Sequence, residues 1–199
     1  KPKKFIFEDK KKFPSKKGLK KVDYSDNIEE IMHSHLYSMK TVIELKNKYE
    51  QEHNISYDIV MISRMDVVWF NKINLQNINK EKIYISPWSY ANDKNKTRNL
   101  KCPYDSYFIS NSQNINCFID MYNNLNKYIH HHNSHWIKYY YFIDNNYQNK
   151  IDYIFYRFHD FVMLRWLYYP DNQFERNGKP ITDEWTGFLE QRKILLKLL

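Results

Sequence analysis

Arg64 and Asp66 interrupt an apolar run that extends from Tyr57 to Phe70. An unpaired charge inside a buried strand is costly, so a charged pair in the middle of such a run marks a strand end. The segment is predicted to form a strand, a charged turn and a second strand. A carboxylate and an arginine there are suited to a divalent cation and a phosphate, because open α/β folds bind ligands at the carboxyl edge of the sheet. The alternative is a structural ion pair between the two side chains.

Further charged residues lie at positions where burial demands a partner or a cleft. Asp105 lies at the start of a strand predicted over 104–109, and His159 and Asp160 lie between apolar neighbours in a helix predicted over 153–167. A buried ionisable side chain is stable only when it is paired or faces a cleft. His159 and Asp160 are therefore expected either to be paired or to face a cleft.

Trp88 and Tyr90 lie in a polar, turn-rich segment, residues 88–103, which follows a short strand predicted over 82–86. Pro87 ends that strand. The segment is the best candidate for an active-site loop. Its two aromatic rings either pack against the core, as loop aromatics more often do, or stack on a base or sugar.

The histidine and cysteine patterns do not favour a metal site. Consecutive residues such as His130 to His132 cannot all point at one ion, and the surrounding Asn and Ser residues predict a loop. His33 and His35 lie on or beside the apolar stripe of a predicted helix, which favours packed or surface histidines. Cys102 and Cys117 form no Cys-x-x-Cys motif, so a structural zinc site is not expected.

The net charge of +8 belongs to one end of the 199-residue chain. Residues 1–24 hold ten lysines against three acidic residues, whereas the remainder is almost neutral. We expect this segment to be a solvated arm or to bind an anionic partner such as phosphate or lipid headgroups. Nucleic-acid binding is not favoured, because it requires basic residues interleaved with aromatic ones on one face.

The length predicts one domain with a core, over residues 25–182, between the basic segment 1–24 and a terminal helix over 183–199. Long helices are predicted from Ser25 or Asp26 to about His53-Asn54 and over 112–128. No run of 18 apolar residues exists, and no signal peptide is evident in the chain as given. A cytoplasmic location is thus the default expectation, and no oligomeric state is predicted. The fold class is α/β, with a small mixed sheet flanked by helices.

These residues also carry a resemblance. The order of a long helix, Tyr57-Asp58, an apolar strand, Arg64-x-Asp66 and then Asp105 resembles the glycosyltransferases with the A-type, nucleotide-sugar-binding fold, over roughly residues 27–110. The resemblance implies transfer of a sugar from a nucleotide-sugar donor to a glycan or protein acceptor, assisted by a divalent cation, Mn²⁺ or Mg²⁺.

By this resemblance, Asp66 takes the place of the metal-binding aspartate of the Asp-x-Asp motif, and His159 is a second candidate metal ligand. Arg64 replaces the first acid of the motif and would contact a phosphate or orient a carboxylate. Asp160 is expected to act as general base, and Asp105 is expected to bind a sugar hydroxyl or to act as the base instead.

The chain also departs from the family pattern. Only Phe5-Ile-Phe7, among lysines, precedes the first helix, where such enzymes have a strand and a glycine-containing loop for the base. That part is truncated, supplied by another segment, or lost. The alternative to a transferase is thus a noncatalytic binding or interaction domain on a remnant of the fold.

Overall fold

The computed structural model describes residues 28–70, 72–87, 103–131, 134–155 and 160–164, together with Phe13, residues 175–176, 179–180 and 192–193, and Lys197. Trp88, Tyr90 and His159 therefore lie outside the described residues, as does nearly all of the basic segment. Of the predicted terminal helix, the structure describes Arg192, Lys193 and Lys197, each with helical backbone.

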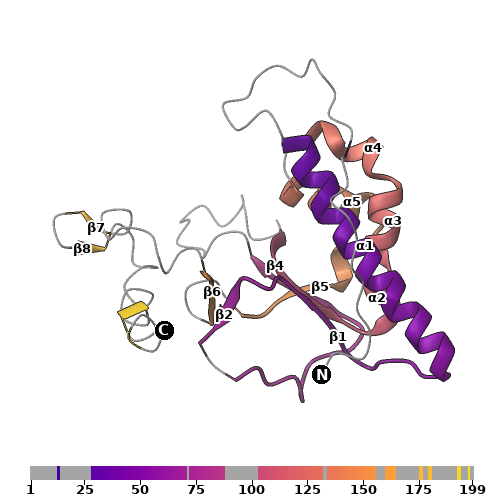
Figure 1. Ribbon diagram of the computed structural model, residues 1–199, viewed down its shortest axis with the longest axis horizontal. Coiled ribbons are helices and arrows are strands. Elements are labelled where there is room, and N and C mark those ends of the chain that lie inside the picture. The colour runs from indigo at the N-terminus through magenta and orange to yellow at the C-terminus, as the bar shows by residue number, and fades with distance from the viewer. Residues whose placement is uncertain are drawn as a thin grey trace. The chain divides into compact units, whose positions relative to one another are not determined.

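The described chain combines helices with small sheets, which confirms the α/β class at the coarse level (Figure 1). One long helix is followed by a run of strands, a run of short helices and then the remaining strands. Among the described residues no helix has both the length and the apolar character needed to cross a membrane. The elements are α1 (Ile28–His53), β1 (Val60–Ser63), β2 (Val67–Trp69), β3 (Ile83–Pro87), β4 (Pro103–Ser110), α2 (Ser112–Ile115), α3 (Cys117–Asn123), α4 (Leu125–Tyr128), η1 (Ile129–His131), α5 (Ser134–Asp144), η2 (Gln148–Lys150), β5 (Ile151–Tyr153), β6 (Phe161–Met163), β7 (Glu175–Arg176) and β8 (Lys179–Pro180).

Helix α1 ends where its sequence predicts. Asn54 follows His53 with a φ of 51°, a left-handed conformation that asparagine tolerates better than most residues. The N–H of Ile55 donates to the carbonyl of Glu50 at 3.0 Å, and the N–H of Asn54 donates to that of Gln51 at 3.4 Å. Both bonds belong to the Schellman motif, which satisfies carbonyl groups at a helix end.

The helical segment after β4 is broken into three short helices. Asn116 separates α2 from α3, and Asn124 separates α3 from α4. The side-chain amide of Asn124 donates to the carbonyl of Asp120 at 2.9 Å, so it competes with the backbone of the helix. The single helix predicted over 112–128 is therefore helical in content but interrupted.

Four strands form a sheet of order β1-β4-β3-β5. The N–H of Ser112 donates to the carbonyl of Tyr57 at 3.3 Å, while the N–H of Arg64 donates to the carbonyl of Ser106 at 3.0 Å. Residue numbers thus rise along β1 as they fall along β4, so these two strands are antiparallel. As a result, the carboxyl end of β1 lies beside the first half of β4.

The helix predicted over 153–167 is wrong, because this segment contains strands. β5 ends at Tyr153, and β6 pairs antiparallel with β2 in the register Val67↔Met163, Val68↔Val162 and Trp69↔Phe161. Aromatic and β-branched residues pack well on a pleated surface, and β2 supplies backbone partners that the sequence around β6 does not reveal.

Two compact units emerge from the backbone contacts. Unit 1 takes the described residues within Lys1–Ile62, Lys80–Ile83 and Ile109–Ile151, and unit 2 takes those within Ser63–Asn79, Tyr84–Phe108 and Asp152–Leu199. The core of unit 1 includes Leu36, Ile43, Ile115, Phe118, Ile137 and Phe142, and that of unit 2 includes Tyr107, Phe108, Phe161 and Val162.

Candidate functional site

The charged turn between β1 and β2 holds the predicted ion pair. The Nε of Arg64 donates to Oδ1 of Asp66 at 2.7 Å, and its Nη2 donates to Oδ2 at 2.7 Å. Both side chains are 35% exposed. A two-pronged contact of this kind fixes the plane of the guanidinium as well as its position. The structural ion pair, which the sequence left open as the alternative, is therefore present.

Neighbouring strands hold the backbone of this turn on both sides. The N–H of Arg64 donates to the carbonyl of Ser106 in β4, and the carbonyl of Asp66 accepts from the N–H of Leu164 at 2.6 Å, beyond the end of β6. Met65, at the tip of the turn, is fully exposed. The turn thus presents its side chains from a backbone that is fixed at both ends.

Asp105 belongs to the same region. It precedes Ser106, whose carbonyl receives the Arg64 N–H, so the antiparallel pairing of β1 with β4 brings Asp105 toward the turn. The hydrogen bonds that Arg64 donates to Asp66 raise the pKa of Arg64 above its ordinary value, against the opposing effect of burial. The charges of Asp66 and Asp105 add to the rise. We call Arg64, Asp66 and Asp105 the Arg64 cluster.

Asp160 lies at the other end of the β2–β6 ladder. Its carbonyl accepts from the N–H of Phe70 at 2.8 Å, whereas Asp66 bonds to Leu164. Phe70 lies four positions after Asp66. At a rise of about 3.4 Å per residue, this places the α-carbons of Asp66 and Asp160 roughly 14 Å apart. The transferase interpretation of the sequence predicts that Asp66, Asp105 and at least one of His159 and Asp160 converge within about 10 Å, and His159 lies outside the described residues. The register of the ladder therefore does not bring Asp160 to the Arg64 cluster.

An aromatic cluster in unit 2 supports the strand that carries Asp105. Trp69 lies 5.4 Å from the ring centroid of Tyr107, 5.4 Å from that of Phe155 and 5.2 Å from that of Phe161. The buried hydroxyl of Tyr107 has one proton to donate and lies within hydrogen-bonding distance of the carbonyl groups of Ile154 and Phe155. Sequence analysis missed Tyr107 as a positioning residue, although its place two residues after Asp105 puts both on one face of the strand.

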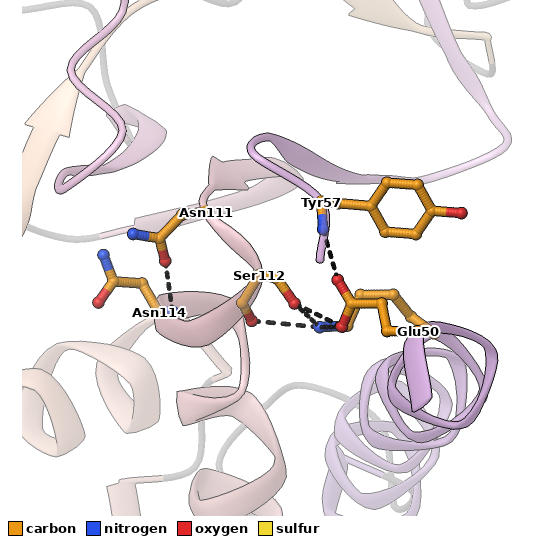
Figure 2. A network of polar contacts seen from close by, with 6 residues as sticks. Glu50, Tyr57, Asn111, Ser112 and Asn114 are labelled. Atoms are coloured by element: carbon orange, nitrogen blue, oxygen red, sulfur yellow. Dashed lines mark hydrogen bonds and ion pairs between the residues drawn. The ribbon is translucent and has the colours of Figure 1, made fainter. Parts of the chain in front are cut away.

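A second polar group, in unit 1, combines a hydroxyl, an ammonium and a carboxylate (Figure 2). Oε2 of Glu50 accepts from the hydroxyl of Ser112 at 2.7 Å and from Nζ of Lys46 at 3.0 Å, and Oε1 accepts from the N–H of Tyr57 at 2.7 Å. Lys46 also donates to the hydroxyl and the carbonyl of Ser112. Asn111 caps the helix that Ser112 begins by accepting from the N–H of Asn114.

This group does not have the properties of a nucleophilic site. Lys46 is paired with Glu50, so its ammonium acts as a donor and not as a base. Burial acts to raise the pKa of Glu50, but hydrogen bonds from the Tyr57 N–H, Ser112 and Lys46 outweigh it and leave the pKa below its ordinary value. A carboxylate with a lowered pKa is a poor base for the Ser112 hydroxyl. The group therefore fastens the end of α1 to the segment before β1 and to the start of α2.

Of the two ligands that the resemblance implies for a cation, Asp66 is described and His159 lies outside the described residues. Among the residues that the structure describes, no group of three or more His, Cys, Asp or Glu side chains is placed to hold a metal ion. Both carboxylate oxygens of Asp66 accept from Arg64. His131 instead stacks on Tyr140, with ring centroids 3.9 Å apart.

Comparisons with family models, with curated proteins and with solved structures find no match to this chain.

Proposed function

We propose that the chain is a glycosyltransferase that uses a nucleotide-sugar donor, with the Arg64 cluster as its donor site. One observation carries the proposal. Residues that are distant in sequence, the Arg64-x-Asp66 turn and Asp105, come together at the carboxyl end of β1 on a backbone fixed by neighbouring strands. These are the charged positions that the family resemblance singles out for the donor.

Arg64 is the group suited to the donor diphosphate. Asp66 uses two of the five guanidinium N–H groups, so three N–H groups lie outside this ion pair. A guanidinium held in a fixed plane is pre-organised for phosphate oxygens. Arg64 would thus counter the charge that grows on the nucleotide diphosphate as the glycosidic bond breaks.

Asp105 is the carboxylate suited to the acceptor. An inverting transferase needs a base that takes the proton of the acceptor hydroxyl while its oxygen attacks the anomeric carbon and the nucleotide diphosphate leaves. Asp105 lies within electrostatic range of Arg64, whereas the ladder places Asp160 at the far end of β2. We therefore assign the base to Asp105 and not, as the sequence predicts, to Asp160.

The divalent cation stays a prediction. The described residues offer only Asp66 of its two expected ligands, and that carboxylate is engaged with Arg64. The proposed role of Arg64, which counters the charge on the donor diphosphate, therefore does not require a cation. The binding experiment compares Mn²⁺, Mg²⁺ and EDTA to test for one.

The test is calorimetric and thermal-shift binding of a panel of nucleoside diphosphates and nucleotide sugars, with Mn²⁺, with Mg²⁺ and with EDTA. Binding of one nucleotide should weaken by about tenfold or more in Arg64→Lys, because lysine cannot form the two-pronged contact. Asp58→Asn is the matched control, since it removes the exposed Lys80–Asp58 ion pair of unit 1. The proposal fails if the folded wild-type chain binds no nucleotide, or if Arg64→Lys and the control bind equally well.

A second candidate is a noncatalytic binding or interaction domain on a remnant of the same fold. The observation that favours it is the Arg64–Asp66 pair itself, which satisfies both charges without any ligand. In that case Asp66→Ala lowers the stability of the chain by about 1 kcal/mol, as for a partly exposed pair, and changes no nucleotide affinity. In the transferase, the same variant should abolish turnover while leaving most of the fold intact.

A further inference from the structure

Helix α5 exposes aromatic side chains where a surface helix normally carries polar ones. Ile137, Lys138, Tyr141 and Phe142 are buried along one side of the helix. Trp136 and Tyr140, four residues apart and therefore on one face, are each 37% exposed. A helix that is apolar on its outer face as well as on its core face marks a contact surface.

The exposed rings are arranged against one another. Tyr140 stacks on His131 of η1, with centroids 3.9 Å apart and planes inclined by 13°. Trp136 lies 6.1 Å from Tyr140 at 33°, and Tyr139 meets Tyr140 edge-on at 5.2 Å. We call His131, Trp136, Tyr139 and Tyr140 the α5 platform. Rings that hold one another in place lose little conformational entropy when they bind a ligand.

The charges beside the α5 platform compensate each other. Lys127 donates to Asp144 at 2.9 Å, and the charge of His131 contributes to the lowered pKa of Asp144, after the hydrogen bonds from Lys127 and Tyr128. A nucleic-acid site needs basic residues available to phosphate groups. The ion pair at this surface instead favours a neutral ligand.

Aromatic faces with polar edges match one neutral class of ligand. The face of an aromatic ring carries negative charge density, and the C–H groups on the face of a pyranose ring carry partial positive charge, so the two stack. The indole N–H and the tyrosine hydroxyls can hydrogen-bond to sugar hydroxyls at the edge of such a stack.

We propose that the α5 platform is a saccharide-binding surface that takes a neutral oligosaccharide by stacking on Trp136 and Tyr140. All of its residues belong to unit 1, and it shares none with the Arg64 cluster. The inference therefore holds whether the chain transfers sugars or only binds them.

The test is calorimetric titration with neutral oligosaccharides of different linkage, namely maltohexaose, cellohexaose and chitohexaose. At least one should bind the wild-type chain, and Trp136→Ala/Tyr140→Ala should weaken that binding by about tenfold or more. Tyr57→Ala is the matched control, because Tyr57 is 38% exposed in the same unit but lies outside the platform. Trp136→Leu keeps an apolar side chain and removes the ring, so it should weaken binding as well and serves if the double variant does not fold.

Two results would overturn the inference: no oligosaccharide binds the wild-type chain, or binding is equal in the platform variants and in Tyr57→Ala. Binding of oligothymidylate that is lost in the platform variants would assign the surface to nucleic acid instead. Nucleotide binding tests the donor site separately. It should be unchanged in Trp136→Leu and weakened in Arg64→Lys. Failure of one proposal is therefore distinguishable from failure of the other.

Discussion

Replacement of Glu50 by alanine should destabilise unit 1 more than any loss of a surface ion pair. The Glu50 side chain is only 12% exposed and accepts hydrogen bonds from the Tyr57 N–H, the Ser112 hydroxyl and Lys46 (Figure 2). The variant leaves the ammonium of Lys46, itself 10% exposed, without its carboxylate partner. It also removes the contact between the end of α1 and the segment before β1.

The size of the effect follows from these contacts. A hydrogen bond to a charged group contributes about 1.5–3 kcal/mol, and breaking a buried ion pair costs about 3–5 kcal/mol. Because the three contacts share one carboxylate close to the surface, we expect a loss of about 3 kcal/mol in the free energy of unfolding. Glu50→Gln keeps the shape and one carbonyl acceptor, so it should lose about 1–2 kcal/mol.

Urea unfolding followed by circular dichroism measures both losses. Glu44→Ala is the matched control on the same helix, because Glu44 is 51% exposed and meets Lys40 only at 3.7 Å, which predicts a loss below about 0.5 kcal/mol. A loss in Glu50→Ala no larger than that of Glu44→Ala would refute the reasoning.

The pH dependence gives an independent check on Glu50. Its folded-state pKa is lowered, so its contribution is complete above the ordinary value of 4.5 and is lost as the pH falls below it, through the folded-state pKa. The stability difference between wild type and Glu50→Gln should therefore shrink as the pH falls from 7 through this window. A difference that does not change with pH would show that the charge of Glu50 contributes nothing.

Three further predictions concern other buried side chains. Burial lowers the pKa of His33, against the charge of Glu29, and the buried Nδ1 of His33 has no partner among the described residues. The free energy of unfolding should therefore fall as the pH drops below the ordinary value of 6.5. In urea unfolding at several pH values, His33→Phe should flatten this dependence. Burial strongly raises the pKa of the Cys117 thiol, so iodoacetamide should label Cys117 only after unfolding. Peptide mass spectrometry detects the label, and rapid labelling of the folded chain would contradict the burial of Cys117. Tyr107→Phe removes a buried hydroxyl that donates its one proton at the carbonyl groups of Ile154 and Phe155, so it should lower the unfolding free energy by about 1–2 kcal/mol. An unchanged midpoint in urea would show that this hydrogen bond contributes nothing.

Much of the local structure could be predicted because it depends on neighbours in the chain. Helix α1 ends at His53 because Asn54 adopts a left-handed conformation, and the strands on either side of Arg64 and Asp66 follow from the apolar run that these charges interrupt. The ion pair between these residues, one of two interpretations that the sequence left open, also forms over two positions. Short-range sterics and hydrogen bonding act within a few residues, so the sequence alone carries these signals.

The segment before Asp160 shows where such signals fail. Tyr153 to Leu167 has the composition of a buried apolar helix, yet Phe161–Met163 forms a strand because β2, almost a hundred residues earlier, offers its backbone groups. Periodicity over a short apolar run does not separate a strand from a buried helix. The partner in the sheet decides between them.

The residue types, the charged turn and its position between two strands were thus determined by the sequence. Only the tertiary structure decided that Asp105 would approach Arg64, since that depends on the antiparallel pairing of β1 with β4. It also decided that Asp160 would lie at the far end of the β2–β6 ladder, because the register of that ladder fixes the separation along the strand. Contacts between distant segments depend on which faces and strand edges satisfy one another, and this is a property of the whole fold and not of any local stretch of chain.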